Sequence, residues 1–426
     1  MRIHIKTYGC TLNQADSDII ASLLDDGTNE LTGSAHDPDV VVVNTCTVKR
    51  ATSQKILYEL GKLQEAGKRV VVTGCMAGAN QDLIKKYAPG ASIVTTSNIP
   101  EMQQAVSATN SGQQVMLTKY RKDDRLAYYN PNGSKVARIA VSDGCLSSCS
   151  FCETKFARGP LNSFEERRIL DAIRYSVARG AKEIQLTSQD MGAYGLDRKT
   201  NIAELMSKIT DIEGDFRVRV GMLNPEHLHR YFDGFAEALQ SEKFYKFMHL
   251  PVQSGSDRVL SDMRRACTTA EFEAFVLELR KRIPESTIET DIIVGYPTET
   301  DSDFELTLDM IKRLKPDVTN ISKFGARPHA DASKLAQHPQ GIINSRSLML
   351  SRVVRSVQHE LNDRHVGRHM PITITEDTEK SYNGRSLSYK QVVIRKVPYN
   401  GKIELGSTQN VVITNASANV LYGSIE

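Results

Sequence analysis

Apolar and polar positions along the first hundred residues alternate between a strand pattern and a helix pattern. Apolar strand candidates cover Arg2 to Thr7, Asp39 to Val43 and Arg69 to Val72. Between the last two, apolar residues recur every three or four positions from about Thr47 to Ala66, which predicts a helix with one buried face. Strands that alternate with helices pair in parallel, so residues 1–108 are predicted to form a small parallel α/β domain.

Residues 109–134 lack sustained periodicity. They hold the turn residues Asn110-Ser-Gly112 and a charged run from Lys119 to Arg125. Clusters of this kind are typical of loops, so the segment is predicted to be a solvated linker.

The strand and helix rhythm returns on a larger scale between residues 135 and 361. A capping-box pattern at Ser163 and Glu166 predicts the start of the first helix, and Gly180 its end. Six strand candidates alternate with helices: Ala137 to Val141, Glu183 to Thr187, Phe216 to Val220, Phe247 to Leu250, Thr287 to Val294 and Val318 to Phe324. Six such units predict a partial (β/α)6 barrel with its active site at the carboxyl ends of the strands.

The last part of the chain, residues 362–426, changes to short β-rich runs separated by turn residues such as Asn383-Gly384 and Asn400-Gly401. The runs are Pro371 to Thr375, Gln391 to Arg395, Lys402 to Leu405, Asn410 to Thr414 and Ala418 to Tyr422. Five such strands predict a small OB-like β-barrel. Cations interleaved with Tyr382 and Tyr389 favour contact with RNA phosphates and bases, and a module that only packs on the barrel is the alternative.

Composition narrows the class of protein without deciding its partner. The 426 residues are 40% hydrophobic and 25% charged, with a net charge of only +3, as in ordinary globular proteins. The apolar runs are far too short to span a bilayer, so we expect a cytoplasmic protein without a membrane partner. Seven widely spaced cysteines favour metal or redox chemistry in a reducing compartment over a disulfide framework.

Three of the cysteines form a CxxxCxxC loop, Cys145-Leu-Ser-Ser-Cys149-Ser-Phe-Cys152, directly after a strand candidate. Three thiolates leave one iron of a [4Fe-4S] cluster without a protein ligand, and that iron is open to a second cofactor. A structural zinc site is the alternative, but it needs a fourth ligand, and no Cys or His follows closely.

Three more cysteines, Cys10, Cys46 and Cys75, each follow a strand of the first domain. The carboxyl ends of parallel strands share one edge of the sheet, so these cysteines are expected to converge on a second three-cysteine site. Inert burial in the core is the alternative for them, and it is the expected role of the seventh cysteine, Cys267.

The CxxxCxxC loop, with Phe151 before its last cysteine, resembles the signature of the radical S-adenosylmethionine (SAM) enzymes. With Cys10, Cys46 and Cys75 ahead of it and a small β-barrel behind it, the whole chain resembles the radical SAM methylthiotransferases, which have an N-terminal methylthiotransferase domain, a radical SAM domain and a C-terminal TRAM domain. The segment from Lys6 to Ser17 is most similar to the archaeal and eukaryotic threonylcarbamoyladenosine branch.

The resemblance implies an enzyme that converts N6-threonylcarbamoyladenosine at position 37 of the tRNA anticodon loop to its 2-methylthio derivative. It implies SAM and two [4Fe-4S] clusters, one on Cys145, Cys149 and Cys152 and an auxiliary one on the other trio. An electron donor and a sulfur donor are needed as well, and the sequence identifies neither. Candidate SAM contacts, for which strand capping is the alternative role, are Phe151, Gln189, Asp190, Gln253, Ser254, Gly295 and Pro297.

Other functions stay open at this point. The same chemistry occurs in the family on isopentenyladenosine in tRNA and on an aspartate of a ribosomal protein. A protein of another class, a non-catalytic iron–sulfur RNA-binding protein, would share the clusters without the SAM site. The segment from Gly325 to Ala332 also departs from the family, because His329 and Ala330 replace a Gly and a Thr. No general acid or base is predicted among the histidines.

Overall fold

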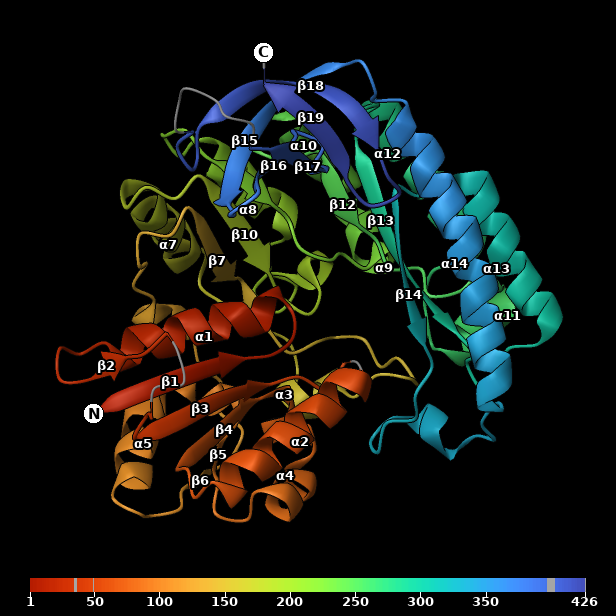
Figure 1. The fold of residues 1–426 in the computed structure, drawn as a ribbon. Coiled ribbons are helices and arrows are strands. Elements are labelled where there is room, and N and C mark those ends of the chain that lie inside the picture. Colours follow the sequence, from red (N-terminus) through yellow and green to blue (C-terminus); the bar gives the residue numbers. More distant parts are fainter. Residues whose placement is uncertain (34–36, 49, 397–402, 426) are drawn as a thin grey trace.

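Three folded parts follow one another in the computed structural model of this chain (Figure 1), which describes residues 1–33, 37–48, 50–396 and 403–425. An N-terminal six-stranded sheet comes first, two three-stranded sheets form the middle part, and a closed five-stranded barrel ends the chain. No helix in the described part of the chain is long and apolar enough to cross a membrane.

The N-terminal sheet is parallel throughout, in the order β2-β1-β3-β4-β5-β6, which confirms the predicted parallel α/β domain. Its central strands are entirely buried because helices cover both faces, which explains their runs of valine. The strands are β1 (Arg2–Thr7), β2 (Glu30–Leu31), β3 (Val40–Thr45), β4 (Val70–Gly74), β5 (Ser92–Val94) and β6 (Met116–Leu117). The helices are α1 (Thr11–Leu24), α2 (Arg50–Glu65), α3 (Cys75–Ala79), α4 (Gln81–Tyr87) and α5 (Met102–Asn110).

Residues 109–134, which were predicted to be a solvated linker, are partly ordered against the rest of the protein. Met116–Leu117 form β6 at the edge of the N-terminal sheet, and a 3-10 turn at Arg125–Tyr128 follows. As whole residues, Arg125 is 3% exposed and Leu126 6% exposed. The prediction of a solvated connector is therefore wrong for this stretch, because its charged residue is drawn into a buried ion-pair network.

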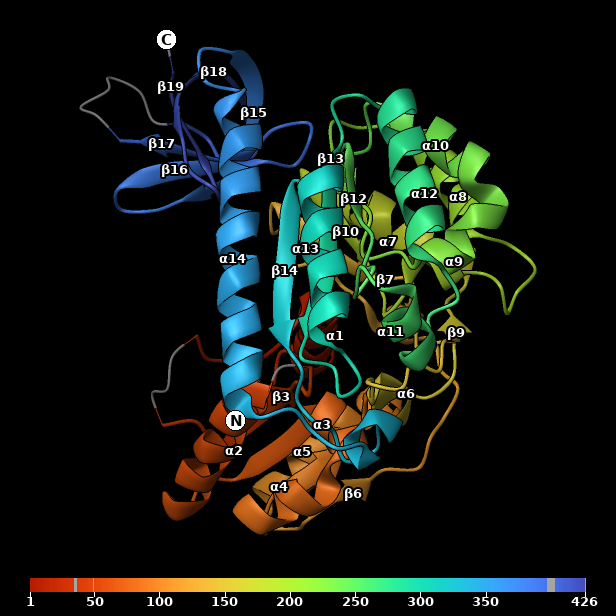
Figure 2. The same ribbon diagram turned by 90° about the vertical axis from the view of Figure 1, so that its right-hand side faces the viewer.

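All six predicted strands of the middle part are present. They are β7 (Val136–Ala140), β10 (Glu183–Thr187), β11 (Arg217–Arg219), β12 (Phe247–His249), β13 (Thr287–Val294) and β14 (Val318–Lys323). They form two parallel sheets, β7-β10-β11 and β12-β13-β14, which a parallel bridge between Val218 and Phe244 connects. Outside this curved wall lie helices that include α7 (Glu166–Ala178), α8 (Ile202–Thr210), α10 (Phe232–Gln240), α12 (Thr269–Arg282) and α13 (Asp301–Leu314) (Figure 2). The predicted partial barrel is confirmed.

The predicted capping box at Ser163 and Glu166 is wrong. Ser163 belongs to the short strand β9 (Asn162–Ser163), which pairs with β8 (Ser142–Asp143), and its hydroxyl accepts a hydrogen bond from the Gly195 N–H at 2.9 Å. With Ser163 engaged there, α7 begins at Glu166 without a side-chain cap.

The C-terminal barrel is closed in the order β15-β16-β17-β19-β18, as an OB-like prediction requires. Its strands are β15 (His369–Asp377), β16 (Ser381–Arg385), β17 (Gln391–Arg395), β18 (Thr408–Ala416) and β19 (Leu421–Ile425). Two local predictions are wrong: Asn383-Gly384 lies inside β16 instead of in a turn, and residues 403–405 form no strand. Lys402 and the predicted turn Asn400-Gly401 lie outside the described residues.

The N-terminal domain and the C-terminal barrel lie at opposite ends of the middle part (Figure 1). The C-terminal barrel sits at the amino ends of the strands, where the Lys246 N–H donates to the Leu387 carbonyl at 2.8 Å. Tyr389 is held there as well, because its hydroxyl donates to Glu183 at 2.8 Å and its ring packs on Tyr245. This half-buried tyrosine, held against the middle part, is not the base-stacking ring that the sequence suggested. Helix α14 (Gln340–Asp363) connects the two ends (Figure 2).

Candidate active site

The CxxxCxxC loop lies at the carboxyl end of the first barrel strand. Strand β7 leads through β8 into the loop, and helix α6 (Thr154–Arg158) follows directly after Cys152. The three thiols are half-buried and line a cavity of about 140 Å³, together with residues that include Arg264 and His329. The loop therefore presents three sulfur donors to one enclosed volume at the mouth of the barrel.

Burial controls the protonation of these thiols. It raises the pKa of Cys145 to about 12 and also raises the pKa of Cys149, which the Arg265 guanidinium lowers in part. An Arg265 Nη1 lies 3.7 Å from the Cys149 Sγ. Metal ligation requires thiolates, so metal must displace protons from this site, as iron and zinc do at cysteine clusters. Three soft donors with a neighbouring cation fit an iron–sulfur cluster, whose net charge is negative.

The second trio lies at the carboxyl edge of the N-terminal sheet. Cys10 precedes α1, Cys46 follows β3, and Cys75 is the first residue of α3. The amide of Asn13 stands among them, since its Oδ1 lies 3.9 Å from the Cys10 Sγ and 3.7 Å from the Cys75 Sγ. Burial raises the pKa of Cys75 to about 12, with further contributions from Cys46 and Cys10. The structure thus brings the three residues together as three soft donors, a set that also fits an iron–sulfur cluster.

The two trios adjoin because α3 and α6 pack against each other. Cys75 begins α3, and α6 follows Cys152 by one residue. The contact is so close that a Cβ at Gly78 would lie 2.1 Å from the Ala157 carbonyl oxygen. Burial lowers the pKa of Arg327, while Glu153, Cys46 from one trio and Cys152 from the other raise it.

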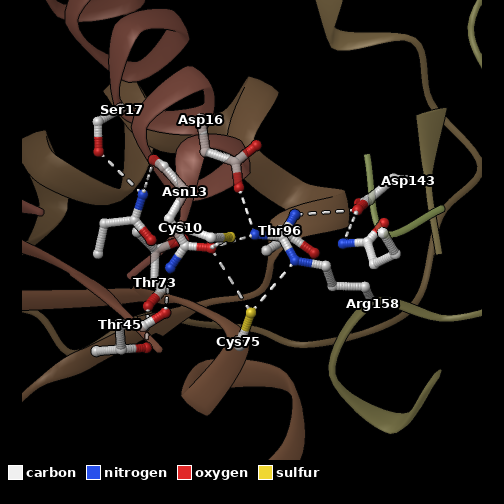
Figure 3. Close-up of polar contacts among 12 residues, drawn as sticks. Cys10, Asn13, Asp16, Ser17, Thr45, Thr73, Cys75, Thr96, Asp143 and Arg158 are labelled. Atoms are coloured by element: carbon white, nitrogen blue, oxygen red, sulfur yellow. Dashed lines mark hydrogen bonds and ion pairs between the residues drawn. The ribbon is translucent and has the colours of Figure 1, made fainter. Parts of the chain in front are cut away.

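Two arginines and two aspartates form a buried network beside the second trio. Figure 3 shows the part of this network around Arg158. Arg158 donates to Asp16 at 2.7 Å and to Asp143 at 3.0 Å, and Arg125 lies 3.2 and 2.9 Å from the same two carboxylates. Burial alone would raise the pKa of Asp143, but Arg125 and Arg158 lower it below its usual value. Asp143 is therefore ionised, and the two positive charges of the arginines balance the two negative charges of the aspartates in this buried network.

Arg158 also reaches the second trio directly. Its Nε–H donates to the Cys75 Sγ at 3.3 Å, and its Nη2 donates to Asn13 Oδ1 at 2.7 Å. The sequence analysis missed Arg158, Asn13, Asp16 and Asp143. The only signal for them is position, because Asp143 and Arg158 flank the CxxxCxxC loop and Asn13 and Asp16 follow Cys10 closely.

The predicted SAM contacts are spread around the mouth of the barrel. Gln189 and Asp190 follow β10, Gln253 and Ser254 follow β12, and Gly295 and Pro297 follow β13. Phe151, inside the CxxxCxxC loop, packs against the apolar cluster around Tyr296. The structure places all seven at or near the carboxyl ends of the strands.

Two of these residues have features that suit a ligand, and a third, Gly295, is fixed by packing within the protein. The Gln189 Oε1 is buried without a hydrogen-bond partner among the described residues. Gln253 adopts a positive φ of 82°, a strained conformation for this residue that is concentrated at functional sites. Gly295 has a φ of 74°, and a Cβ there would lie 2.6 Å from Ile343, so only glycine fits.

Asp190, in contrast, is engaged within the protein. Its Oδ1 accepts from the N–H groups of Gly192 and Asn224, and its Oδ2 accepts from the Asn224 side chain at 2.8 Å. It is 1% exposed. These contacts give Asp190 the strand-capping role that was the alternative to SAM binding.

The histidines and Cys267 have ordinary partners. The His249 Nε2 lies 2.9 Å from an Asp291 carboxylate oxygen. The His329 Nε2 lies 2.6 Å from the Ala79 carbonyl oxygen, so His329 connects residues 325–332, where the sequence differs from the family, to α3. Within the described residues, His249, Glu289 and Asp291 form the one group of three ligand atoms within 4.8 Å of one another. Cys267 packs against the barrel core, as expected of a passive thiol.

Known proteins share this organisation. Residues 2–96 match the family model described as Uncharacterized protein family UPF0004, and residues 139–311 match the Radical SAM superfamily. A protein of Pyrococcus abyssi named "Probable threonylcarbamoyladenosine tRNA methylthiotransferase" is 37% identical over 430 residues, covering 100% of this chain and 99% of that protein. The chain belongs to the threonylcarbamoyladenosine tRNA methylthiotransferase family. Its radical SAM domain accounts for an iron–sulfur cluster and for SAM.

The family extends to eukaryotes, as the sequence resemblance indicated. The Homo sapiens protein named "Threonylcarbamoyladenosine tRNA methylthiotransferase" is 34% identical over 409 residues, covering 93% of this chain and 70% of that protein. Among solved structures, the radical SAM methyltransferase TsrM of Kitasatospora setae, with cobalamin and a [4Fe-4S] cluster bound, superposes with a TM-score of 0.57. It is 15% identical and the match covers 78% of this chain and 73% of that one, so it shows a shared fold alone.

Proposed function

We propose that this family member converts N6-threonylcarbamoyladenosine at position 37 of tRNA to its 2-methylthio derivative. The curated relatives carry this substrate in their names, and the Pyrococcus abyssi protein aligns with the chain from end to end. In this structure the proposal is supported by the contact between α3 and α6, which packs the helix that begins at Cys75 against the helix that follows Cys152. Sulfur insertion needs a radical source beside a sulfur source, and this contact favours such an arrangement.

The bond to be broken explains why the site is built from cysteines. An aromatic C2–H is not acidic enough for a side-chain base, so the reactive species must come from a cofactor. When bound, SAM and the cluster on Cys145, Cys149 and Cys152 supply a 5′-deoxyadenosyl radical, and SAM also supplies the methyl group. The protein's own task is to hold, orient and shield these groups, and SAM would lie against Gln189, Gln253 and Gly295.

We place a second [4Fe-4S] cluster on Cys10, Cys46 and Cys75. Three cysteines, two of them beside the Asn13 amide and one bonded to a guanidinium, form a suitable ligand set that would leave one iron open for the sulfur to be inserted. The exposed Cys10 marks the side from which a sulfur donor would reach that iron.

The tRNA would extend between the two ends of the molecule. A base of the single-stranded anticodon loop can be splayed into the mouth of the barrel. The C-terminal barrel lies at the other end, one length of α14 away, which is about 36 Å for its 24 residues. A contact between that barrel and the RNA therefore falls on the stem or on another arm instead of on the modified base.

Iron content tests the two-cluster assignment. Protein reconstituted without oxygen is expected to hold about eight irons if each trio binds a four-iron cluster. Cys46→Ala is expected to hold about half as many, because one of three ligands of one cluster is lost. Cys267→Ala is the matched control and should keep the full content. Full iron content in Cys46→Ala would remove this residue from the site.

A further inference from the structure

Arg158 is a buried cation that belongs to one half of the active site and bonds to the other. Its side chain is 1% exposed and comes from α6, directly after the CxxxCxxC loop. Its Nε–H donates to the Sγ of Cys75, which lies across the interface at the start of α3 (Figure 3). Its two terminal nitrogens bond to Asn13, Asp16 and Asp143.

Arg158 is not the only cation that neutralises Asp16 and Asp143. Arg125 approaches the same two carboxylates, Asp16 at 3.2 Å and Asp143 at 2.9 Å, and its side chain is 4% exposed. Both arginines therefore share the task of neutralising the aspartates. Of the two, only Arg158 bonds to a cysteine among the described contacts. The contact with Cys75 is what distinguishes it.

A hydrogen bond to a ligand sulfur has a known electrostatic effect. It stabilises negative charge on the cluster, and the reduced cluster carries one more negative charge than the oxidised one. Donors to the sulfurs and nearby cations therefore raise the reduction potential of an iron–sulfur cluster. Burial strengthens this effect, because the surroundings of Arg158 are dry and weakly polarisable.

We propose that Arg158 is a positioning residue that raises the reduction potential of the cluster bound by Cys10, Cys46 and Cys75, through its Nε–H bond to Cys75. The inference rests on the proposed function, since it assumes a cluster on that trio. The step involved is reduction of the cluster by one electron from an external low-potential donor, dithionite in the titration; no bond forms or breaks, and the Nε–H proton stays on Arg158. Because Arg158 follows the CxxxCxxC loop in the chain, its bond to Cys75 links the reduction potential at the second trio to the position of that loop.

A redox titration in a background with a single cluster tests the inference. Cys145, Cys149 and Cys152 are replaced by alanine in the full chain, so that the remaining iron, about four per chain, belongs to the second trio. Arg158→Gln removes the charge and the Nε–H donor, and Arg158→Lys keeps only the charge. Arg125→Lys is the matched control, because it disturbs the same two aspartates without touching a cysteine. The midpoint potential is read from the electron paramagnetic resonance signal.

We expect the midpoint of Arg158→Gln to shift to a more negative potential, that of Arg158→Lys to shift less, and that of Arg125→Lys to match the parent. An unchanged midpoint in Arg158→Gln, or an equal shift in Arg125→Lys, would overturn the inference. Loss of iron from both Arg158 variants but not from Arg125→Lys would also overturn it, since Arg158 would then be purely structural. A parent without iron would instead contradict the proposed second cluster itself, and the inference with it.

Discussion

The side chains at the two cysteine trios differ in whether they can be identified from the sequence alone. The cysteines could be predicted because they recur at strand ends and at CxxxCxxC spacing. Arg158 could not, because its partner Asp16 lies 142 positions away and neither residue belongs to a recurring pattern. Only the fold, which brings α1 with Asp16 next to α6 with Arg158, makes them neighbours. Candidate ligands that repeat can thus be predicted from the sequence, whereas the residues packed around them become apparent only in the fold.

The ion pair of His249 with Asp291 makes the stability of the protein depend on pH. Burial lowers the pKa of His249, but the hydrogen bond that the imidazolium donates to Asp291, together with the charges of Asp291 and Glu289, outweighs burial and raises the pKa above its usual value. A histidine with a raised folded-state pKa stabilises the protein fully below its unfolded pKa, near 6.5, and that contribution is lost as pH rises through the folded pKa. The ion pair of His249 with Asp291 is therefore worth most in mild acid.

We expect His249→Gln to lower the free energy of unfolding by roughly 1–2 kcal/mol at pH 6, as for loss of a charged hydrogen bond. The difference from the parent should shrink toward pH 9, and urea unfolding at both pH values measures it. His359→Gln, at an exposed position on α14, is the control and should show no such trend. A deficit that grows with pH would contradict the assigned charge on His249.

At the scale of elements, periodicity predicted all six barrel strands and the parallel N-terminal sheet, because their apolar faces are buried by helices. It failed where tertiary contacts override local signals. Ser163 resembles a helix cap but serves β9, and Asn383-Gly384 resembles a turn but continues β16 within a closed barrel. The five-residue helix α3 was not predicted either, since it is too short to show a period.

Helix α3 nonetheless carries Cys75 at its first position, and Gly78 is the residue through which it touches α6. A methyl group there would lie 2.1 Å from the Ala157 carbonyl oxygen, so Gly78→Ala must push α3 and α6 apart. We expect a loss of about 1–3 kcal/mol in the free energy of unfolding, which is typical of overpacking.

Gly61→Ala is the matched control, because a Cβ at that helical position meets nothing closer than 4.0 Å. It should stabilise the protein slightly by its higher helix propensity. Thermal unfolding of both variants measures the contrast. Equal stability of Gly78→Ala and the parent would contradict a tight contact between the two helices.

At the scale of the whole molecule, the order of the three parts was predictable but their arrangement was not. The C-terminal barrel docks at the amino ends of the strands through contacts such as that between Tyr389 and Glu183, which are 206 residues apart. The catalytic mouth and the C-terminal barrel are therefore separated by the length of α14 (Figure 1). An elongated substrate such as tRNA suits this separation better than a small peptide segment does.

The nucleoside content of tRNA tests the central claim most directly. The gene is removed and then restored either intact or as Cys149→Ala, and the nucleosides of total tRNA are measured by mass spectrometry. We expect 2-methylthio-threonylcarbamoyladenosine to disappear on removal, to return with the intact gene and to stay absent with Cys149→Ala, while threonylcarbamoyladenosine accumulates. Loss of the methylthio form of isopentenyladenosine instead, or an unchanged nucleoside profile, would contradict the account.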